Sequence, residues 1–373
     1  MVKYKLGDIC EIVSGSTPKT SVENYWDGDI KWITPAEIND DTYIINDSVR
    51  KITELGVKKT GLSPFPEGTI ILSSRAPIGK VAIAGCEMYC NQGFKNLICS
   101  DKIYNKYLYW FLKGNTAFLN SLGRGATFKE ISKAIVSEIE INVPNIEHQK
   151  EAVGALEKVS GVISLRKKEL LALDKLIKAR FVEMFGNGHD GFCNTKKLGE
   201  FCKFQQGTQI PVEEQIEEQL EGYTRFLRII DYTQAPQIPR YVSVKGREIA
   251  EDSVVIVRYG ATAGFVGHGY AGILANNLFE VVPDESILSK DFLYLALKYG
   301  TFEQEVHDKA FGAAMPALSF GMMNDIGVVT PNSTAQNGFI DFVKHVDKSK
   351  ATVQKALDET QLLFDSLMQQ YFG

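Results

Sequence analysis

Cysteine, long apolar runs and secretion signals are scarce or missing in this sequence, and each absence excludes a class of protein. The 373 residues contain six cysteines, too few for a disulfide framework, and no Cys-x-x-Cys pair typical of a zinc site. No apolar run approaches the ~18 residues that span a bilayer. The first residues lack the apolar segment of a signal peptide. We therefore expect a reduced, cytoplasmic protein.

An excess of basic residues is also lacking. The net charge is -5, so any contact with nucleic acid must come from local basic groups rather than from a positive field around the whole molecule. Much of the negative balance comes from one short acidic segment, which we interpret as solvated. Its members are Glu213, Glu214, Glu217, Glu218 and Glu221.

Enzymatic motifs are missing too. Gly79-Lys80 is followed by Val81 and has no upstream glycine, so it is not a phosphate-binding loop. The Asn-Pro-Pro-aromatic and Asp-Pro-Pro-aromatic sequences of amino-methyltransferases do not occur. Asp29-Ile30-Lys31 lacks the acidic partner of a metal nuclease, and the five histidines have no metal or triad spacing. The sequence therefore predicts a binding protein with no catalytic residue, metal site or cofactor of its own.

An internal repeat is the most informative feature that is present. Leu6-Gly7-Asp8-Ile9-Cys10 recurs as Leu198-Gly199-Glu200-Phe201-Cys202. Residues 68–79 match residues 253–264, and Phe185-Gly186 matches Phe372-Gly373. Because the matches keep the same order along the whole chain, we infer a duplicated unit of about 187 residues.

Each repeat has two parts of different character. The first part, about 145 residues, mixes short β-rich runs with turns and short helices, which predicts a mixed α/β globule. The second part is free of proline and carries apolar residues at heptad spacing, which is typical of helices wound on a partner. The predicted seam positions are Leu156, Ile163, Leu170, Ile177, Met184, Val346, Val353, Leu357, Phe364 and Leu367.

These parts predict an α+β fold in which two mixed α/β globules are joined by two long antiparallel helices. At ~1.5 Å per residue, each helix would be a rod of roughly 60 Å, too long to pack on one globule alone. The predicted bounds are 1–145 and 187–333 for the globules, and 146–186 and 334–373 for the helices. The repeats would be related by a pseudo-twofold axis, as duplex DNA is. An alternative remains open, in which each helix packs on its own globule only.

Six short motifs relate the chain to a known family. They are Leu6-Gly7-Asp8 before Gly15-Ser16-Thr17-Pro18, Trp26-x5-Trp32-Ile33-Thr34-Pro35, Ile71-Leu72-Ser73-Ser74-Arg75, Gly79-Lys80-Val81, Asn91-Gln92-Gly93-Phe94 and Val143-Pro144-x4-Gln149. With this ordered set, the chain resembles the DNA-specificity subunit of type I restriction–modification enzymes over essentially its full length. The second repeat departs at residues 205–211 and has no tryptophan pair, which leaves open the bases that are read.

The resemblance implies that each globule is a target-recognition domain for one half of a bipartite DNA target, with the helix pair as a ruler between the halves. It implies a subunit that is catalytically inert. Two modification subunits would dock on the helices and methylate adenine with S-adenosylmethionine. Restriction subunits would add translocation and cleavage, using ATP and magnesium.

Candidate DNA contacts lie in glycine-rich loops with an interleaved arginine, lysine or aromatic residue, because such loops can approach the DNA backbone and project into the major groove. In the first globule they are Lys19, Arg75, Lys80, Arg124, Thr127 and Lys129. In the second they are Gln205, Gln206, Arg225, Arg228, Arg258, Tyr259 and Lys309.

Two other functions remain open from the sequence. One is a standalone DNA-binding or structural adaptor that dimerises through its helices and has no methyltransferase partner. The other is an enzyme with a cryptic nuclease or transferase site. Co-purification with a methyltransferase would distinguish the first from a specificity subunit, and DNA binding without cleavage would exclude the second.

Overall fold

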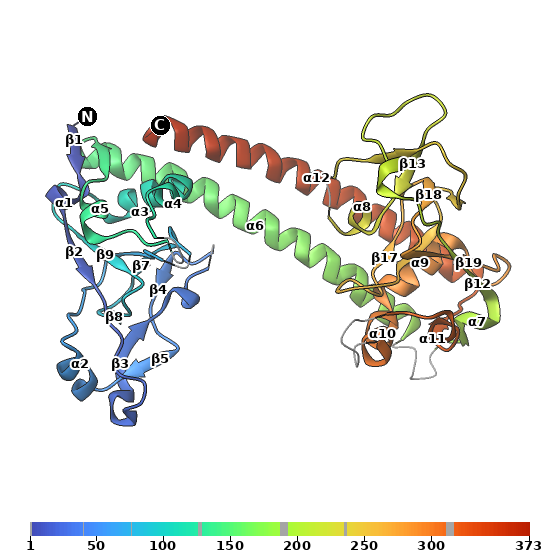
Figure 1. Ribbon diagram of the computed structural model, residues 1–373, viewed down its shortest axis with the longest axis horizontal. Coiled ribbons are helices and arrows are strands. Elements are labelled where there is room, and N and C mark those ends of the chain that lie inside the picture. The colour runs from blue at the N-terminus through green and yellow to red at the C-terminus, as the bar shows by residue number, and fades with distance from the viewer. Residues whose placement is uncertain are drawn as a thin grey trace. The chain divides into compact units, whose positions relative to one another are not determined.

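A computed structural model describes residues 2–39, 41–75, 77–125, 129–186, 193–234, 237–310 and 317–373, with the backbone alone at 309 and 310 (Figure 1). The chain divides into two compact units. Unit 1 is Met1–Arg166 with Ala356–Gly373, and unit 2 is Lys167–Lys355. The division cuts both long helices, α6 (Ile146–Phe185) and α12 (Ser333–Phe372), so the domain bounds inferred from the sequence remain a prediction.

The described residues of unit 1 form three sheets. Their strand orders are β1-β10, β2-β9-β6-β7-β4 and β5-β3-β8. The strands are β1 (Val2–Lys5), β2 (Cys10–Ser14), β3 (Trp26–Ile33), β4 (Ile44–Ile45), β5 (Arg50–Ile52), β6 (Ile70–Leu72), β7 (Val81–Ala84), β8 (Tyr89–Cys90), β9 (Lys95–Cys99) and β10 (Glu140–Val143). The helices are α1 (Leu6–Ile9), η1 (Glu23–Tyr25), η2 (Pro35–Glu37), α2 (Glu54–Thr60), α3 (Asn105–Gly114), α4 (Thr116–Ser121) and α5 (Lys133–Ser137).

Unit 2 repeats this arrangement, with strand orders β11-β20, β12-β19-β16-β17 and β14-β13-β18-β15. The strands are β11 (Thr195–Lys197), β12 (Cys202–Gln206), β13 (Thr224–Leu227), β14 (Arg240–Val242), β15 (Glu248–Ile249), β16 (Val254–Val257), β17 (Val266–Gly267), β18 (Gly272–Leu274), β19 (Leu278–Pro283) and β20 (Gly327–Val329). The helices are α7 (Leu198–Phe201), η3 (Val212–Glu214), α8 (Ile229–Thr233), α9 (Lys290–Tyr299), α10 (Phe302–Ala310) and α11 (Phe320–Asn324).

Local sequence explains several of these elements. The central strands β6 and β16 are runs of apolar residues because every residue of each strand is buried. Helix α9 begins where the Ser289 hydroxyl accepts a hydrogen bond from the Phe292 N–H. Helix α2 ends at Gly61, whose φ of 66° is a left-handed conformation that glycine adopts without strain. Local sequence signals therefore set where these helices begin and end.

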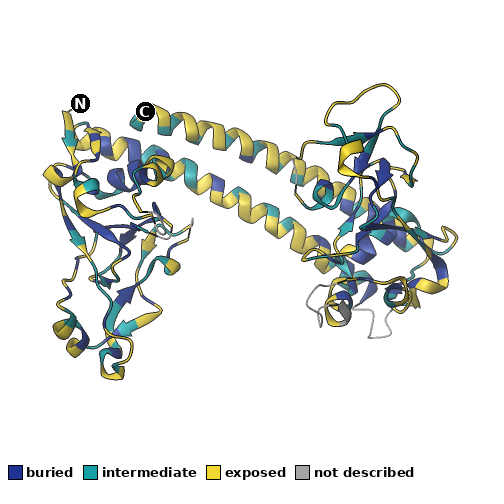
Figure 2. Ribbon diagram, in the orientation of Figure 1, coloured by how far each residue is buried: buried dark blue, intermediate teal, exposed yellow. Residues whose placement is uncertain are grey.

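The long helices contribute to the core of both units. In unit 1, Leu156 of α6 is fully buried, and Phe364 and Leu367 of α12 pack on the same core. In unit 2, the corresponding core contains Phe181 of α6 and Phe339 of α12. Figure 2 shows exposed residues alternating with buried or half-buried ones along both helices.

Within each unit the two helices also contact each other in antiparallel order. In unit 1, the Arg166 guanidinium donates to the Ala356 carbonyl and the Thr360 hydroxyl. In unit 2, the ammonium of Lys350 lies 2.6 Å from the carboxylate of Asp174, and Phe181 packs on Phe339 further towards the end of α6. The helices therefore pack on each other as well as on the globular parts. The predicted α+β class with two mixed regions and long antiparallel helices is confirmed.

All ten predicted seam residues are at least partly covered. The buried ones are Leu156, Ile163, Ile177, Val346 and Leu357. The half-buried ones are Leu170, Met184, Val353, Phe364 and Leu367.

Candidate nucleic-acid interface

Four loops meet in unit 1 and form what we call loop cluster 1: residues 15–18, 34–37, 73–80 without residue 76, and 91–94. Backbone hydrogen bonds join them. The Ser16 N–H donates to the Cys90 carbonyl (3.1 Å), the Asn91 N–H to Ile33 (3.1 Å), and the Ser74 N–H to Gly93 (2.7 Å). Gly15 allows this approach, since a Cβ there would lie 2.1 Å from the Cys90 oxygen.

Loop cluster 2 in unit 2, residues 207–210, 228–231, 257–264 and 275–277, has the same hydrogen bonds. The Thr208 N–H donates to the Leu274 carbonyl (2.7 Å), Ala275 N–H to Leu227 (3.0 Å), and Arg258 N–H to Asn277 (2.9 Å). A Cβ on Gly207 would lie 2.1 Å from the Ala275 oxygen. The two clusters are thus the same structure built from different side chains.

This hydrogen-bond register corrects the alignment of the repeats. Matching residues 68–79 with 253–264 at one offset places Arg75 opposite Gly260. In the structure the backbone of Arg75 forms an isolated antiparallel β-bridge with Glu130, and the backbone of Tyr259 forms the equivalent β-bridge with Ala317. Arg75 therefore corresponds to Tyr259. The loop of unit 2 has one residue more between this position and Gly264 than the loop of unit 1 has between Arg75 and Gly79. In the same register, Asn91 corresponds to Ala275 and Gln92 to Asn276.

The cations predicted in unit 1 fall into two groups. Arg75 lies 3.9 Å from the carboxylate of Glu130, and Lys80 donates to the Pro35 carbonyl (3.0 Å), so both have partners inside the unit. Lys19 and Arg124 are exposed beside the cluster.

Lys129 is also exposed, and backbone hydrogen bonds join the two ends of the segment that carries it. Arg124 and Glu130 exchange two backbone hydrogen bonds of 3.0 and 2.9 Å. Among the described residues, Arg124 and Lys129 have no ion pair. Thr127 lies outside the described residues. Arg124 and Lys129 are therefore available to contact a DNA phosphate.

In unit 2, two aromatic rings lie beside the guanidinium of Arg258, one of the predicted DNA contacts. The Arg258 guanidinium lies 4.6 Å from the ring centroid of Tyr259 and 5.4 Å from that of Phe279, and Tyr259 is 38% exposed. The Gln206 side chain donates to the Asn276 carbonyl (3.0 Å), and Gln205 is half-buried in β12. The side chain of Lys309 lies outside the described residues.

Arg225 and Arg228 are held by a buried acid instead. Two guanidinium nitrogens of Arg228 lie 3.0 and 3.4 Å from the carboxylate of Asp231, which is fully buried. Arg225 lies 3.6 Å from the same carboxylate and 4.3 Å from the ring centroid of Tyr270. A buried carboxylate needs such partners, so these arginines serve the fold. A DNA contact by either remains a prediction.

Three further residues of the loop clusters were not among the sequence-based candidates: Gln92, Gln209 and Asn276. Gln92 and Gln209 are exposed, and Asn276 is half-buried. Gln92 lies inside a family motif and Gln209 in the segment where the second repeat departs from the motif. The only sequence signal for them was therefore their position, since a single amide has no distinguishing pattern.

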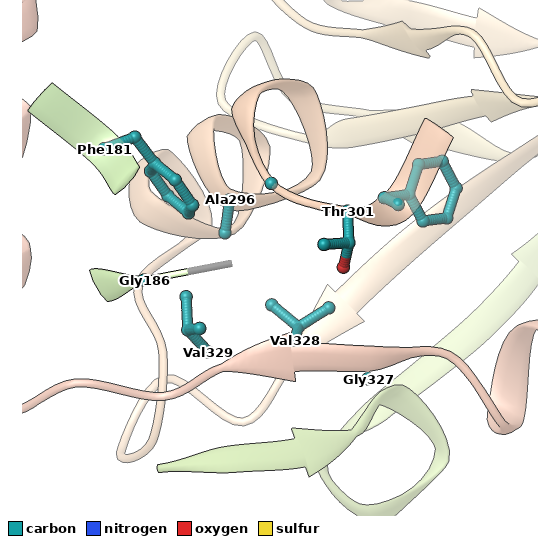
Figure 3. A pocket seen from close by; sticks show the side chains of 9 residues that line it. Phe181, Gly186, Ala296, Thr301, Gly327, Val328 and Val329 are labelled. Atoms are coloured by element: carbon teal, nitrogen blue, oxygen red, sulfur yellow. The ribbon is translucent and has the colours of Figure 1, made fainter. Parts of the chain in front are cut away.

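A metal site and a membrane span find no support in the described part of the chain. No group of three or more His, Cys, Asp or Glu side chains could hold a metal ion there. No described helix is long and apolar enough to cross a membrane. The cavity in Figure 3, between Phe181, Ala296, Thr301, Val328 and Val329, has a volume of about 10 Å³, room for one water molecule at most.

Comparison with known proteins gives the family. The profile of the type I restriction modification DNA specificity domain matches residues 1–175 and 193–360. The chain belongs to this family. Membership assigns it the recognition of a DNA target for a type I restriction–modification complex, in a non-catalytic role.

Individual relatives agree with this assignment. The chain is 36% identical to the MjaIX specificity subunit of Methanocaldococcus jannaschii over 230 residues, covering 56% of this chain and 53% of that one. It thus spans about half the length of that relative. It is 23% identical to the EcoprrI specificity subunit of Escherichia coli, covering 89% and 84% of the two chains.

Solved structures show the same fold. The S subunit from Mycoplasma genitalium has a TM-score of 0.58 at 18% identity, covering 100% of this chain and 96% of that one. A chain from a study of type I system assembly and conformational transition has a TM-score of 0.64 at 17% identity, covering 99% and 97%.

Proposed function

We propose that each unit reads one half of a bipartite DNA target and that the chain thereby directs a type I restriction–modification complex. The observation that carries this proposal is the pair of loop clusters. They share one backbone hydrogen-bond register but differ in side chains. A shared framework with different side chains is what two half-sites of different sequence require, because base edges are distinguished by side-chain donors and acceptors.

The partners follow from the long helices. Unit 1 exposes large apolar side chains on its parts of α6 and α12, among them Leu362 (70%), and unit 2 exposes Leu171 (63%) and Leu176 (48%) on its part of α6. Exposed leucines on helices favour a protein partner. We propose two modification subunits, one for each repeat, and restriction subunits that join them, with the antiparallel helices as the ruler between the half-sites.

The chain would hold no cofactor itself. In this proposal S-adenosylmethionine, ATP and magnesium are used by the partner subunits, and the complex acts in the cytoplasm, where chromosomal DNA is located. The exposed cations Lys19, Arg124 and Lys129 would supply part of the phosphate contact, which makes binding salt-dependent.

The test is to purify the full chain with its cognate modification subunit and to sequence the methylome of cells that carry both. We expect a stable complex and methylation at one bipartite motif with a fixed spacer. A chain that dimerises through its helices and never binds a modification subunit would instead be an adaptor. Methyl transfer or DNA cleavage by the chain alone would contradict a non-catalytic role.

A further inference from the structure

The two loop clusters share a side-chain hydrogen bond as well as their backbone bonds. In unit 1 the Thr17 hydroxyl donates to the side-chain oxygen of Gln92. In unit 2 the side-chain nitrogen of Asn276 donates to the side-chain oxygen of Gln209 (3.2 Å). By the backbone register, Thr17 corresponds to Gln209 and Gln92 to Asn276. The bond is thus kept in both units while all its residue types differ.

These pairs lie at the solvent-facing side of their clusters. Gln92 and Gln209 are exposed, and their partners Thr17 and Asn276 are half-buried. Neighbouring groups fix the position of each pair. In unit 1 the next residue along, Gly93, accepts from the Ser74 N–H, and in unit 2 Asn277 accepts from the Arg258 N–H. A hydrogen bond to a neighbour and a fixed backbone reduce the entropy that an exposed amide loses on binding.

We propose that Thr17–Gln92 and Gln209–Asn276 are base-reading pairs, one in each half-site, and that each reads an adenine in the major groove. The proposal rests on the proposed function. In unit 2 the internal bond uses the Gln209 oxygen and one Asn276 N–H, which leaves the Gln209 N–H groups as donors and the Asn276 oxygen as an acceptor. In unit 1 it leaves the Gln92 N–H groups and the Thr17 oxygen.

A donor beside an acceptor matches one base edge in particular. Adenine presents the N7 acceptor next to the N6 donor in the major groove, and amide side chains pair with both. Guanine presents two acceptors there, cytosine presents a donor, and thymine presents an acceptor beside a methyl group. Each pair therefore favours adenine over the other bases at its position.

The decisive variants are Gln209→Glu and Gln92→Glu. A glutamate still accepts the internal bond from Asn276 or Thr17, so the loops remain joined. It replaces the amide donor by an acceptor, and carboxylates accept from cytosine N4. In complex with the modification subunit, each variant should lose adenine preference by about 5- to 150-fold at one position of one half-site and gain preference for cytosine there. Gln209→Ala should relax the same position without a new preference.

Two control variants distinguish base recognition by the pairs from a purely structural role in holding the loops together. Gln219→Glu adds the same charge at an exposed residue of unit 2 outside the cluster and should leave every base preference unchanged. Thr17→Gln with Gln92→Asn gives unit 1 the pair of unit 2 and should keep adenine. The readout is the methylome, with binding to randomised duplexes as a second measurement. If the methylated motif is unchanged in both glutamate variants, the pairs only hold the loops together and do not read a base. Failure of the wild-type complex to methylate any bipartite motif would instead overturn the proposed function.

Discussion

Phe181 of α6 and Phe339 of α12 pack edge to face in unit 2, with ring centroids 5.4 Å apart. Both rings are buried, and Phe185 and Phe292 pack around Phe339. One aromatic cluster thus joins α6, α9 and α12. The helices are therefore part of the unit 2 core as well as a surface for partners.

Phe339→Ala should consequently destabilise unit 2. Removal of a fully buried ring costs about 3–5 kcal/mol, from lost burial and the cavity left behind. Hydrogen exchange should show faster exchange throughout unit 2, while unit 1 keeps its protection. Leu363→Ala on the exposed side of α12 is the control and should change stability by about 0.5 kcal/mol or less. Equal effects of the two variants would mean that the cluster is not a core.

Arg228→Ala should also destabilise unit 2, because it leaves the buried carboxylate of Asp231 with the N–H of residue 228 (2.9 Å) and the guanidinium of Arg225 (3.6 Å). Breaking a buried ion pair costs about 3–5 kcal/mol. The control is Arg124→Ala, since Arg124 is exposed. Thermal unfolding of both variants is the measurement. A stable Arg228→Ala variant with weakened DNA binding would make Arg228 a DNA contact and contradict its structural role.

The pH dependence of unit 1 should include a contribution from Glu157. Burial opposes ionisation of this carboxyl, but hydrogen bonds from Lys106 (2.8 Å) and Tyr43 (2.5 Å) outweigh it and hold its pKa below the usual value. Folding therefore favours the ionised form. The stabilisation is present above the unfolded pKa of about 4.3 and is lost as the pH falls through the lower folded-state pKa.

Glu157→Gln should reduce stability at pH 7 by about 1 kcal/mol or less, because the pair is partly exposed. Urea unfolding from neutral to acid pH should show the difference between wild type and variant shrinking as the pH falls. Glu151→Gln on the exposed side of α6 is the control. A difference that stays constant at low pH would show that packing, not charge, is lost.

In alkaline solution two tyrosines of α3 should ionise late. Burial raises the pKa of Tyr107 and Tyr109 to about 12. Their neutral forms stabilise the fold fully below the unfolded pKa of about 10, and this stabilisation is lost as the pH rises through the folded-state value. Tyrosinate absorbance should show the late step, and Tyr109→Phe should remove one tyrosine from it. Titration of every tyrosine near pH 10 while the chain is folded would contradict the burial of α3.

Lys129→Ala and Arg124→Ala test the two exposed cations beside loop cluster 1. Glycines flank Arg124, so we expect a phosphate contact, whose loss weakens binding evenly across sequences and lowers the salt slope by about one. We expect Lys129 to reach a base edge, so its loss should cost about 1–3 kcal/mol and relax one half of the target only. Binding to target and scrambled duplexes at several salt concentrations separates the two. If both variants keep wild-type affinity and specificity, Arg124 and Lys129 do not contact DNA and the segment has only a structural role.

The sequence by itself determined the duplication, the α+β class and the two long helices. Repeated motifs align by identity, and heptad spacing reports a helix that packs on another helix, because both are local properties of the chain. Half of the seam residues proved buried and the rest half-buried. Glycine and serine signals at turns and helix ends are local in the same sense.

Only the tertiary structure decided which residues of the loops stand together. Thr17 and Gln92 are 75 residues apart, and Gln209 and Asn276 are 67 apart, so no local pattern links them. The same holds for Asp231, whose buried carboxylate is the partner of two arginines that the sequence makes candidates for DNA contact. A basic residue has the same appearance in a sequence whether it faces a phosphate or a buried acid. Its role depends on burial and on distant neighbours, which the fold alone supplies.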